Sequence, residues 1–273
     1  MKRFFQVMYV FAFLCVMLIV LASNANAAEI IDSGFVGNSN NLGWTLDSEG
    51  TLSISGNKVL KCDGTLDSYS NTKNLPTVHS YDNGFCTNCK GFEPAQLVDD
   101  YYQIGNAGQL YWFAQQVNGG NTGIDGKLTA DIVVNENVLK EDGTLNTGTF
   151  RAWTPIGNDS KKYTGTFDGD GKTVSGLYFN TSSANYVGLF GYVNGGTVKN
   201  VGVINSYFNG DENVGGVVGG NVQGTVLNCY NTGYVYGNAY VGGVVGIGEE
   251  GRIEYCYNIG AIGGDRYVGG VLG

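Results

Sequence analysis

The chain has 273 residues, enough for one large domain or two modest ones, and 45 of them are glycine. Charged residues make up only 14% and apolar residues 42%, so the composition excludes a disordered chain. A net charge of −9 argues against nucleic-acid binding. The single histidine, His79, excludes most catalytic arrangements that depend on this residue type.

The first 27 residues have the order of a secretory signal peptide. Lys2 and Arg3 precede an apolar run over 4–22, and the small-x-small sequence Ala-Asn-Ala follows at 25–27. The alternative is an uncleaved membrane anchor, because the run approaches the length that spans a bilayer. Cleavage would leave 13 basic and 24 acidic residues and a net charge of −11. We therefore expect a secreted or cell-surface protein that does not insert into the membrane after cleavage.

Residues 28–60 predict short strands that include a β-hairpin. Apolar and polar residues alternate on both sides of an Asp-Ser-Glu-Gly turn at 47–50, which places four apolar residues on one face: Trp44, Leu46, Leu52 and Ile54. A lone hairpin is marginally stable in water, so this one should pack on another element.

Residues 61–96 are polar and form a linker or a small module with four candidate metal ligands: Cys62, His79, Cys86 and Cys89. Because a segment with so few apolar residues cannot build a core, we expect a disulfide or a bound metal ion to hold it together. The Cys86-x-x-Cys89 spacing is that of a zinc knuckle, and a site with four protein ligands would hold structural zinc. The alternatives are a disulfide, which an oxidising compartment favours, or no staple at all. The sequence indicates no other cofactor.

The body of the chain, 97–273, should begin with a helix. Asn106 is a suitable N-cap, Gly119 and Gly120 end the run, and apolar residues fall at helical spacing between them: Leu110, Phe113, Ala114 and Val117. A single amphipathic helix ahead of a strand-rich region suggests a cap over an open end of sheet. An ordinary packing helix would fit the same pattern.

Sequence repeats with a period of 27 residues dominate the carboxy-terminal part. Val-Gly-Gly begins at Val214, Val241 and Val268, and Val187 starts a related copy one period earlier. A fixed period of this length means that each unit buries its apolar face against its neighbours. Short β-branched runs separated by glycine predict two or three strands per coil, with glycine at positive φ in the corners. The predicted fold is all-β, a right-handed parallel β-helix with an amino-terminal capping helix.

Equivalent positions of successive coils should stack into ladders, with Cys229 over Cys256, Tyr230 over Tyr257 and Asn231 over Asn258. Stacked asparagines can hydrogen-bond along the axis, and stacked aromatic rings pack face to face. We expect the two cysteines to be buried thiols, because the geometry between neighbouring strands often disfavours a disulfide.

These repeats resemble the GLUG motif of bacterial surface proteins, named for a Gly-Leu-apolar-Gly core. The core is found at 188–191 as Gly-Leu-Phe-Gly, then as Gly-Gly-Val-Val-Gly variants, and the resemblance covers about 97–273. It implies a β-helical stalk or adhesive region of a large exported protein, sometimes upstream of an IgA-peptidase-type catalytic domain. Residues 79–95 are similar to a Cys-x-x-Cys module found between domains of such proteins, and 43–56 resemble a segment of gut-bacterial surface proteins.

Enzymatic chemistry has few candidates in this chain. A His-Glu-x-x-His metallopeptidase needs two histidines, and a serine triad would have to recruit His79, which is remote from any nucleophile elbow. A polysaccharide lyase or glycosidase remains an alternative, because many are right-handed β-helices with carboxylates in a groove. Asp168 and Asp170 are the best local candidates for acid–base or calcium chemistry, although a tight turn uses the same residues.

Eleven tyrosines give the repeats an aromatic character that suits binding: Tyr178, Tyr186, Tyr192, Tyr207, Tyr230, Tyr234, Tyr236, Tyr240, Tyr255, Tyr257 and Tyr267. Some should be exposed to stack on sugars or anchor protein contacts, and the others should fill coil corners. We predict a non-catalytic surface protein whose adhesive or structural β-helix binds host or matrix glycans or proteins. The amino-terminal part of a larger surface peptidase is a further alternative. Because Gly273 lies inside a repeat, we expect a truncated product, or downstream domains or another chain over the last coil.

Overall fold

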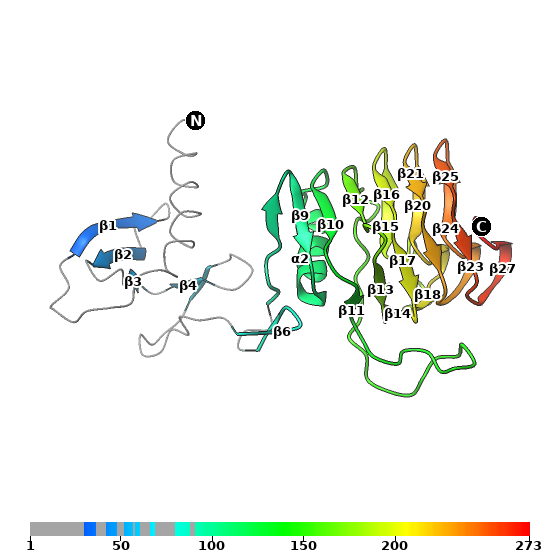
Figure 1. Ribbon diagram of the computed structural model, residues 1–273, viewed down its shortest axis with the longest axis horizontal. Coiled ribbons are helices and arrows are strands. Elements are labelled where there is room, and N and C mark those ends of the chain that lie inside the picture. The colour runs from blue at the N-terminus through cyan, green and yellow to red at the C-terminus, as the bar shows by residue number, and fades with distance from the viewer. Residues whose placement is uncertain are drawn as a thin grey trace. The chain divides into compact units, whose positions relative to one another are not determined.

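The computed structural model describes residues 30–36, 42–47, 52–56, 58–60, 66–68, 80–87 and 91–273 (Figure 1). The chain divides into two compact units, 1–78 and 79–273. The predicted signal peptide lies outside the described residues. Among the residues described, no helix combines the length and the apolar character needed to cross a bilayer.

The first unit contains a three-stranded antiparallel sheet and a separate antiparallel pair. The sheet has the order β1 (Ile30–Val36), β2 (Leu42–Asp47), β3 (Leu52–Gly56), and the pair is β4 (Lys58–Leu60) with β5 (Leu66–Ser68). The hairpin predicted around the turn at 47–50 is confirmed as β2 and β3. Its register places Trp44 opposite Ile54 and Leu46 opposite Leu52, as the alternation of apolar residues requires.

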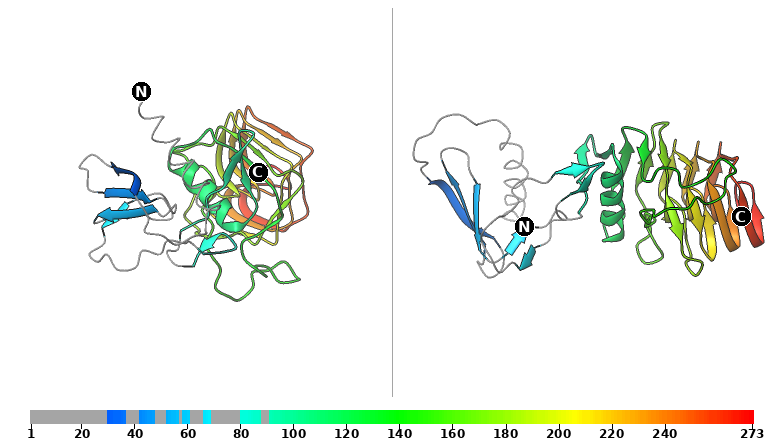
Figure 2. Two further views of the ribbon diagram at one scale, coloured as in Figure 1. Left: turned by 60° about the vertical axis from the view of Figure 1, so that its left-hand side comes forward. Right: turned by 90° about the horizontal axis from the view of Figure 1, so that it is seen from below.

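The second unit is a parallel β-solenoid whose amino-terminal end is closed by other elements. The first element is a hairpin of two short strands, β6 (Tyr81–Asp82) and β7 (Phe85–Cys86). Strand β8 (Gln96–Val98) then pairs antiparallel with β9 (Tyr101–Ile104). Helix α2 (Ala107–Asn118) follows and crosses the open end of the coils (Figure 2). The predicted N-cap is confirmed, because the Asn106 side chain accepts a hydrogen bond from the backbone N–H of Gln109 at 2.9 Å.

Each full coil contributes strands to four parallel sheets. The first continues from β9 through β10 (Asp125–Leu128), β12 (Thr166–Asp168), β16 (Thr197–Lys199), β21 (Thr225–Leu227) and β25 (Arg252–Glu254). The second comprises β11 (Ile132–Val133), β13 (Thr173–Ser175), β17 (Gly202–Ile204), β22 (Tyr230–Asn231) and β26 (Tyr257–Asn258). The third comprises β14 (Tyr178–Asn180), β18 (Tyr207–Asn209), β19 (Glu212–Gly215), β23 (Tyr234–Gly242) and β27 (Ile262–Gly269). The fourth comprises β15 (Phe190–Asn194), β20 (Val218–Val222) and β24 (Val245–Glu249).

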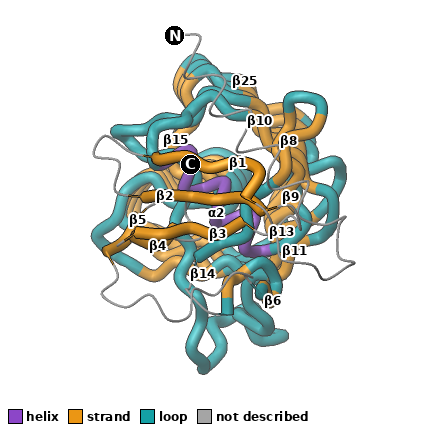
Figure 3. The backbone as a smooth tube through the Cα atoms, turned by 90° about the vertical axis from the view of Figure 1, so that its left-hand side faces the viewer, coloured by secondary structure: helices purple, strands orange, loops and turns teal. Residues whose placement is uncertain are grey.

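The backbone register follows the 27-residue period of the sequence. Val187 pairs with Val214, Val214 with Val241, and Val241 with Val268, all in parallel. Viewed along the stack, successive coils overlap closely (Figure 3). The predicted solenoid is therefore confirmed, with four sheets where two or three strands per coil were expected.

The core is a column of side chains along the solenoid axis. Phe167, Val198 and Val226 occupy equivalent positions in three coils of the first sheet and are fully buried. Helix α2 extends this column, because the Phe113 ring lies 5.8 Å from the Phe167 ring, and the Phe167 ring lies 5.1 Å from that of Phe190. The helix thus closes the end of the core, as the capping interpretation predicted.

The expected role of glycine in the corners is wrong for the regular coils. Within 196–273, every residue with positive φ is an Asn, Gln, Glu or Tyr, for example Asn200 at 58° and Tyr240 at 54°. The glycines are needed for close packing of backbone instead. A Cβ on Gly215 would lie 2.1 Å from the carbonyl oxygen of Val218, and one on Gly219 would lie 2.6 Å from the Val187 nitrogen. The Val-Gly-Gly pattern therefore reflects crowded corners.

Replacing Phe167 by alanine should lower the free energy of unfolding by about 3–5 kcal/mol, because it leaves a cavity where α2 meets the coils. Thr197→Ala, on the outer face of the same sheet, is the matched control and should cost less than about 1 kcal/mol. Urea denaturation followed by circular dichroism measures both. Equal losses for the two variants would contradict the assignment of this core.

Candidate functional site

The candidate zinc ligands are mostly outside the described residues: Cys62, His79 and Cys89. Cys86 lies in β7, is buried, and its N–H donates to the Gly91 carbonyl at 2.8 Å. Within the described part of the chain, no group of three or more His, Cys, Asp or Glu residues is arranged to hold a metal ion. Structural zinc, and the disulfide that is its alternative, stay predictions.

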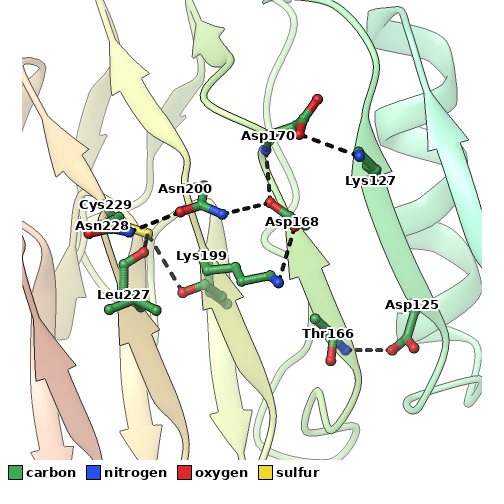
Figure 4. Close-up of polar contacts among 11 residues, drawn as sticks. Asp125, Lys127, Thr166, Asp168, Asp170, Lys199, Asn200, Leu227, Asn228 and Cys229 are labelled. Atoms are coloured by element: carbon green, nitrogen blue, oxygen red, sulfur yellow. Dashed lines mark hydrogen bonds and ion pairs between the residues drawn. The ribbon is translucent and has the colours of Figure 1, made fainter.

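The two candidate catalytic carboxylates are both held by neighbouring side chains (Figure 4). Asp168, at the end of β12, accepts hydrogen bonds on Oδ1 from the Asp170 N–H and from Asn200 Nδ2, each at 2.9 Å. Its Oδ2 lies 3.1 Å from Lys199 Nζ, and Asp170 Oδ1 lies 3.3 Å from Lys127 Nζ. These contacts tie a turn together and link three coils, so they favour the structural interpretation of both residues.

The same contacts determine the acidity of Asp168. Partial burial raises its pKa, but the hydrogen bonds from Asn200, the Asp170 N–H and Lys199 lower it by more. The net result is a pKa below the usual value for aspartate. Asp168 is therefore ionised at neutral pH, which suits a coil-to-coil ion pair and does not suit a general acid.

Asn200 and Asn228 extend this contact along the stack. Asn228 Nδ2 donates to Asn200 Oδ1 at 3.1 Å, and Asn200 in turn donates to Asp168. Both asparagines have left-handed φ values, 58° and 52°, which this residue type tolerates well. The sequence pattern did not lead us to expect this polar ladder, although the repeated Thr-Val-x-Asn at 197–200 and 225–228 indicates it.

The outer side of the third sheet carries a regular array of aromatic and amide groups. Tyr178, Tyr207 and Tyr234 are paired in register, and the rings of Tyr207 and Tyr234 stack at 5.1 Å and 4°. Tyr178 and Tyr207 stack less closely, at 6.1 Å and 25°. We call this surface the tyrosine–asparagine face and define it by six residues: Tyr178, Asn180, Tyr207, Asn209, Tyr234 and Tyr236.

The amide column of the tyrosine–asparagine face is internally hydrogen-bonded. Asn209 Nδ2 donates to Asn180 Oδ1 at 2.8 Å, and Asn180 Nδ2 donates to the Tyr178 hydroxyl at 3.2 Å. Tyr236 takes the next position of this column and is 40% exposed. The face therefore presents hydroxyl and amide groups in a fixed order over three coils, with no charged member.

Stacking limits how these tyrosines can bind a ligand. A ring that lies between two others has both faces covered, so Tyr207 offers only its edge and hydroxyl to solvent. In the next coil Ala261 follows Tyr234 in register, and its small side chain leaves the outer face of the Tyr234 ring without an aromatic partner. Stacking on a sugar ring is thus possible at the end of the column, and hydrogen bonding along it.

The other tyrosine predictions are also resolved by the structure. Tyr230 lies over Tyr257 at 4.9 Å and 4°, as predicted, and Tyr240 over Tyr267 at 4.8 Å and 12°. Seven of the eleven predicted tyrosines are half-buried and none is fully buried. The other four are exposed, all in the last two coils: Tyr236, Tyr255, Tyr257 and Tyr267.

An open pocket lies where the β6–β7 hairpin meets the loop after β11. The guanidinium of Arg151 sits 3.7 Å from the centre of the Phe85 ring, and Asp82 and Glu136 supply the acidic groups of the lining. No sequence pattern predicts this pocket.

Because the folded state depresses the pKa of Asp168, this residue stabilises the fold above its unfolded pKa of about 4, and the contribution is lost as the pH falls below that value. Asp168→Asn should therefore unfold more easily at pH 7, by about 1–3 kcal/mol, and show a smaller further loss between pH 5 and pH 3. Asp265→Asn, at an exposed position, should keep the wild-type pH dependence. Urea unfolding at several pH values tests this, and an unchanged profile for Asp168→Asn would contradict it.

Comparison with known proteins identifies the repeat. Residues 210–236 match the family model of the GLUG motif, and they form one coil, from the end of β18 into β23. Halomucin from Haloquadratum walsbyi is 37% identical over 113 residues, 40% of this chain and 1% of halomucin. A candidate Gly-rich membrane protein from Evansella cellulosilytica is 32% identical over 79 residues, 28% of this chain and 9% of that protein. The chain thus spans a small part of the length of these relatives.

Among solved structures, a candidate immunoglobulin A1 protease from Bacteroides ovatus aligns with a TM-score of 0.47 and 24% identity, over 67% of this chain and 64% of that one. The repeats that resemble the GLUG motif are coils of a parallel β-solenoid, and the chain carries that motif at 210–236.

Proposed function

We propose that this chain is an exported cell-surface protein whose β-solenoid is non-catalytic and binds glycans, with proteins of a host or matrix as the second class of partner. The observation that carries the proposal is the tyrosine–asparagine face. It joins three coils, is uncharged, and presents hydroxyl and amide groups on rigid strands. Such groups suit the hydroxyls of a neutral glycan, and rigid aromatic side chains lose little entropy on binding.

The state of the acidic residues supports a binding role over a catalytic one. Asp168 and Asp170, the best candidates for acid–base chemistry, each contact a lysine of another coil. A retaining or inverting glycosidase needs two carboxyl groups that face the substrate, one of them protonated. Here the depressed pKa of Asp168 works against the protonated state.

The similarity to halomucin and to a candidate Gly-rich membrane protein supports a location at the cell envelope. The predicted signal peptide would deliver the chain there. The acidic charge of the chain favours neutral or basic partners over anionic glycans.

A glycan array probed with the purified chain tests the proposal. We expect saturable binding to neutral glycans without shortened or unsaturated products, and a loss of at least about tenfold in affinity for Tyr207→Ala and for Asn209→Ala. Tyr257→Ala is the matched control, because it removes a stacked ring from another sheet, and it should bind as the wild type does. Product formation would indicate an enzyme, and an array without any binding would leave only a structural role or a protein partner.

A further inference from the structure

Cys229 and Cys256 occupy the same position in two consecutive coils, directly before β22 and β26. Tyr230 pairs with Tyr257 in register, and the Tyr257 N–H donates to the Cys229 carbonyl at 3.2 Å. Neighbouring parallel strands lie about 4.8 Å apart, within the range of Cα separations that a disulfide spans. The two cysteines are free and lie one strand spacing apart in consecutive coils.

Packing does not require cysteine at this position. The equivalent residue one coil earlier is Val201, which is fully buried, since Gly202 pairs with Tyr230. A small apolar side chain is thus sufficient to fill the site. The thiols of Cys229 and Cys256 add a chemical property that the ladder itself does not need.

The two thiols differ in their access to solvent. Cys229 is fully buried, and its sulfur lies 3.2 Å from the Leu227 carbonyl oxygen. Cys256 is half-buried on the outer of the two coils, and its thiol lies 3.3 Å from the Glu254 carbonyl. A reagent from solution can therefore reach Cys256 first, while Cys229 is shielded directly behind it.

Electrostatics gives the two thiols different roles. A hydrogen bond from the Cys229 thiol lowers the pKa of Cys256 to about 7, despite the opposing effect of burial. The same interaction, together with burial, raises the pKa of Cys229 well above its ordinary value. At pH 7 about half of the Cys256 side chains are thus thiolates, the form that attacks disulfides, and Cys229 holds its proton.

We propose that Cys256 and Cys229 form a thiol-modification site that reacts with low-molecular-weight disulfides, with Cys256 as the attacking residue and Cys229 as the resolving residue. The Cys256 thiolate attacks one sulfur of the reagent, forms a mixed disulfide and expels one thiolate. Cys229 then loses its proton and attacks the Cys256 sulfur, which expels the second thiolate. In total two protein thiols are oxidised to a disulfide, and the reagent is reduced to two thiols.

The product would tie the last described coil to the coil before it. That last coil exposes several large apolar side chains, among them Ile259 at 76% and Tyr267 at 62%. A covalent link at Cys256 would hold this coil against the coil that contains Cys229.

Peptide mapping of the reduced chain after treatment with glutathione disulfide tests the site. Trypsin cleaves after Lys199, Arg252 and Arg266, which places Cys229 in peptide 200–252 and Cys256 in peptide 253–266. We expect the two peptides to become disulfide-linked in the wild type. Cys229→Val should instead retain glutathione on Cys256, and Cys256→Val should leave Cys229 unmodified. Valine is the matched substitution, since Val201 fills this position one coil earlier, and circular dichroism verifies that the variants fold.

The pH dependence of alkylation gives a second readout. In the wild type the rate of iodoacetamide addition to peptide 253–266 should reach half its maximum near pH 7. In Cys229→Val the midpoint should move to higher pH, because the thiolate has lost its hydrogen-bond donor. The proposal is overturned if both thiols stay reduced in the folded chain while the urea-unfolded chain becomes linked. Equal modification of the remaining cysteine in the two variants would also overturn it.

Discussion

The parallel hydrogen bonding of each coil to the next is the constraint on which the whole solenoid depends. Because the register repeats, a side chain meets its own equivalent at about 4.8 Å, so each position must be compatible with a copy of itself. Asparagine satisfies this condition by donating to its copy, as Asn231 does to Asn258 at 2.8 Å. Tyrosine satisfies it by stacking. A charged residue cannot satisfy this condition, because like charges directly opposite each other are destabilising. In the first sheet the charges of one column therefore alternate in sign, from Lys127 through Asp168 to Lys199.

The same constraint explains the unusual composition. Tight coils bring backbone segments so close at the corners that a Cβ would collide with a neighbouring carbonyl or nitrogen, as at Gly215 and Gly219. The positions that turn the chain through positive φ are more open, and there Asn and Tyr are accepted because their side chains gain a partner in the next coil. The high glycine content therefore reflects close backbone packing at the corners more than a need for positive φ in the turns.

The sequence predicted what the period controls and missed what lies between the periodic positions. The alignment of Val187, Val214, Val241 and Val268 and the pairing of Tyr230 with Tyr257 follow from a shift of 27 residues. The contact of Asn200 with Asp168 does not, because Phe-Asp-Gly-Asp-Gly breaks the repeat and its register was unknown. The exposure of a tyrosine depends on whether a ring, an alanine or a glycine lies over it in the next coil. This depends on how the coils pack and not on the period alone. The role of Cys62, His79 and Cys89 lies beyond the described residues.

Function in such a solenoid should be sought where a column changes residue type. Within a uniform ladder every group is engaged by its own copy, so little chemistry is left over for a ligand. Asp168 lies in register between Lys127 and Lys199 and is ion-paired with Lys199. The tyrosine column, in contrast, ends at Ala261 and leaves one face of Tyr234 uncovered. The position of Val201 is occupied by cysteine in the next two coils, which thereby acquire thiols that packing does not need. The breaks in the ladders, and not the repeats themselves, carry the specific properties of this chain.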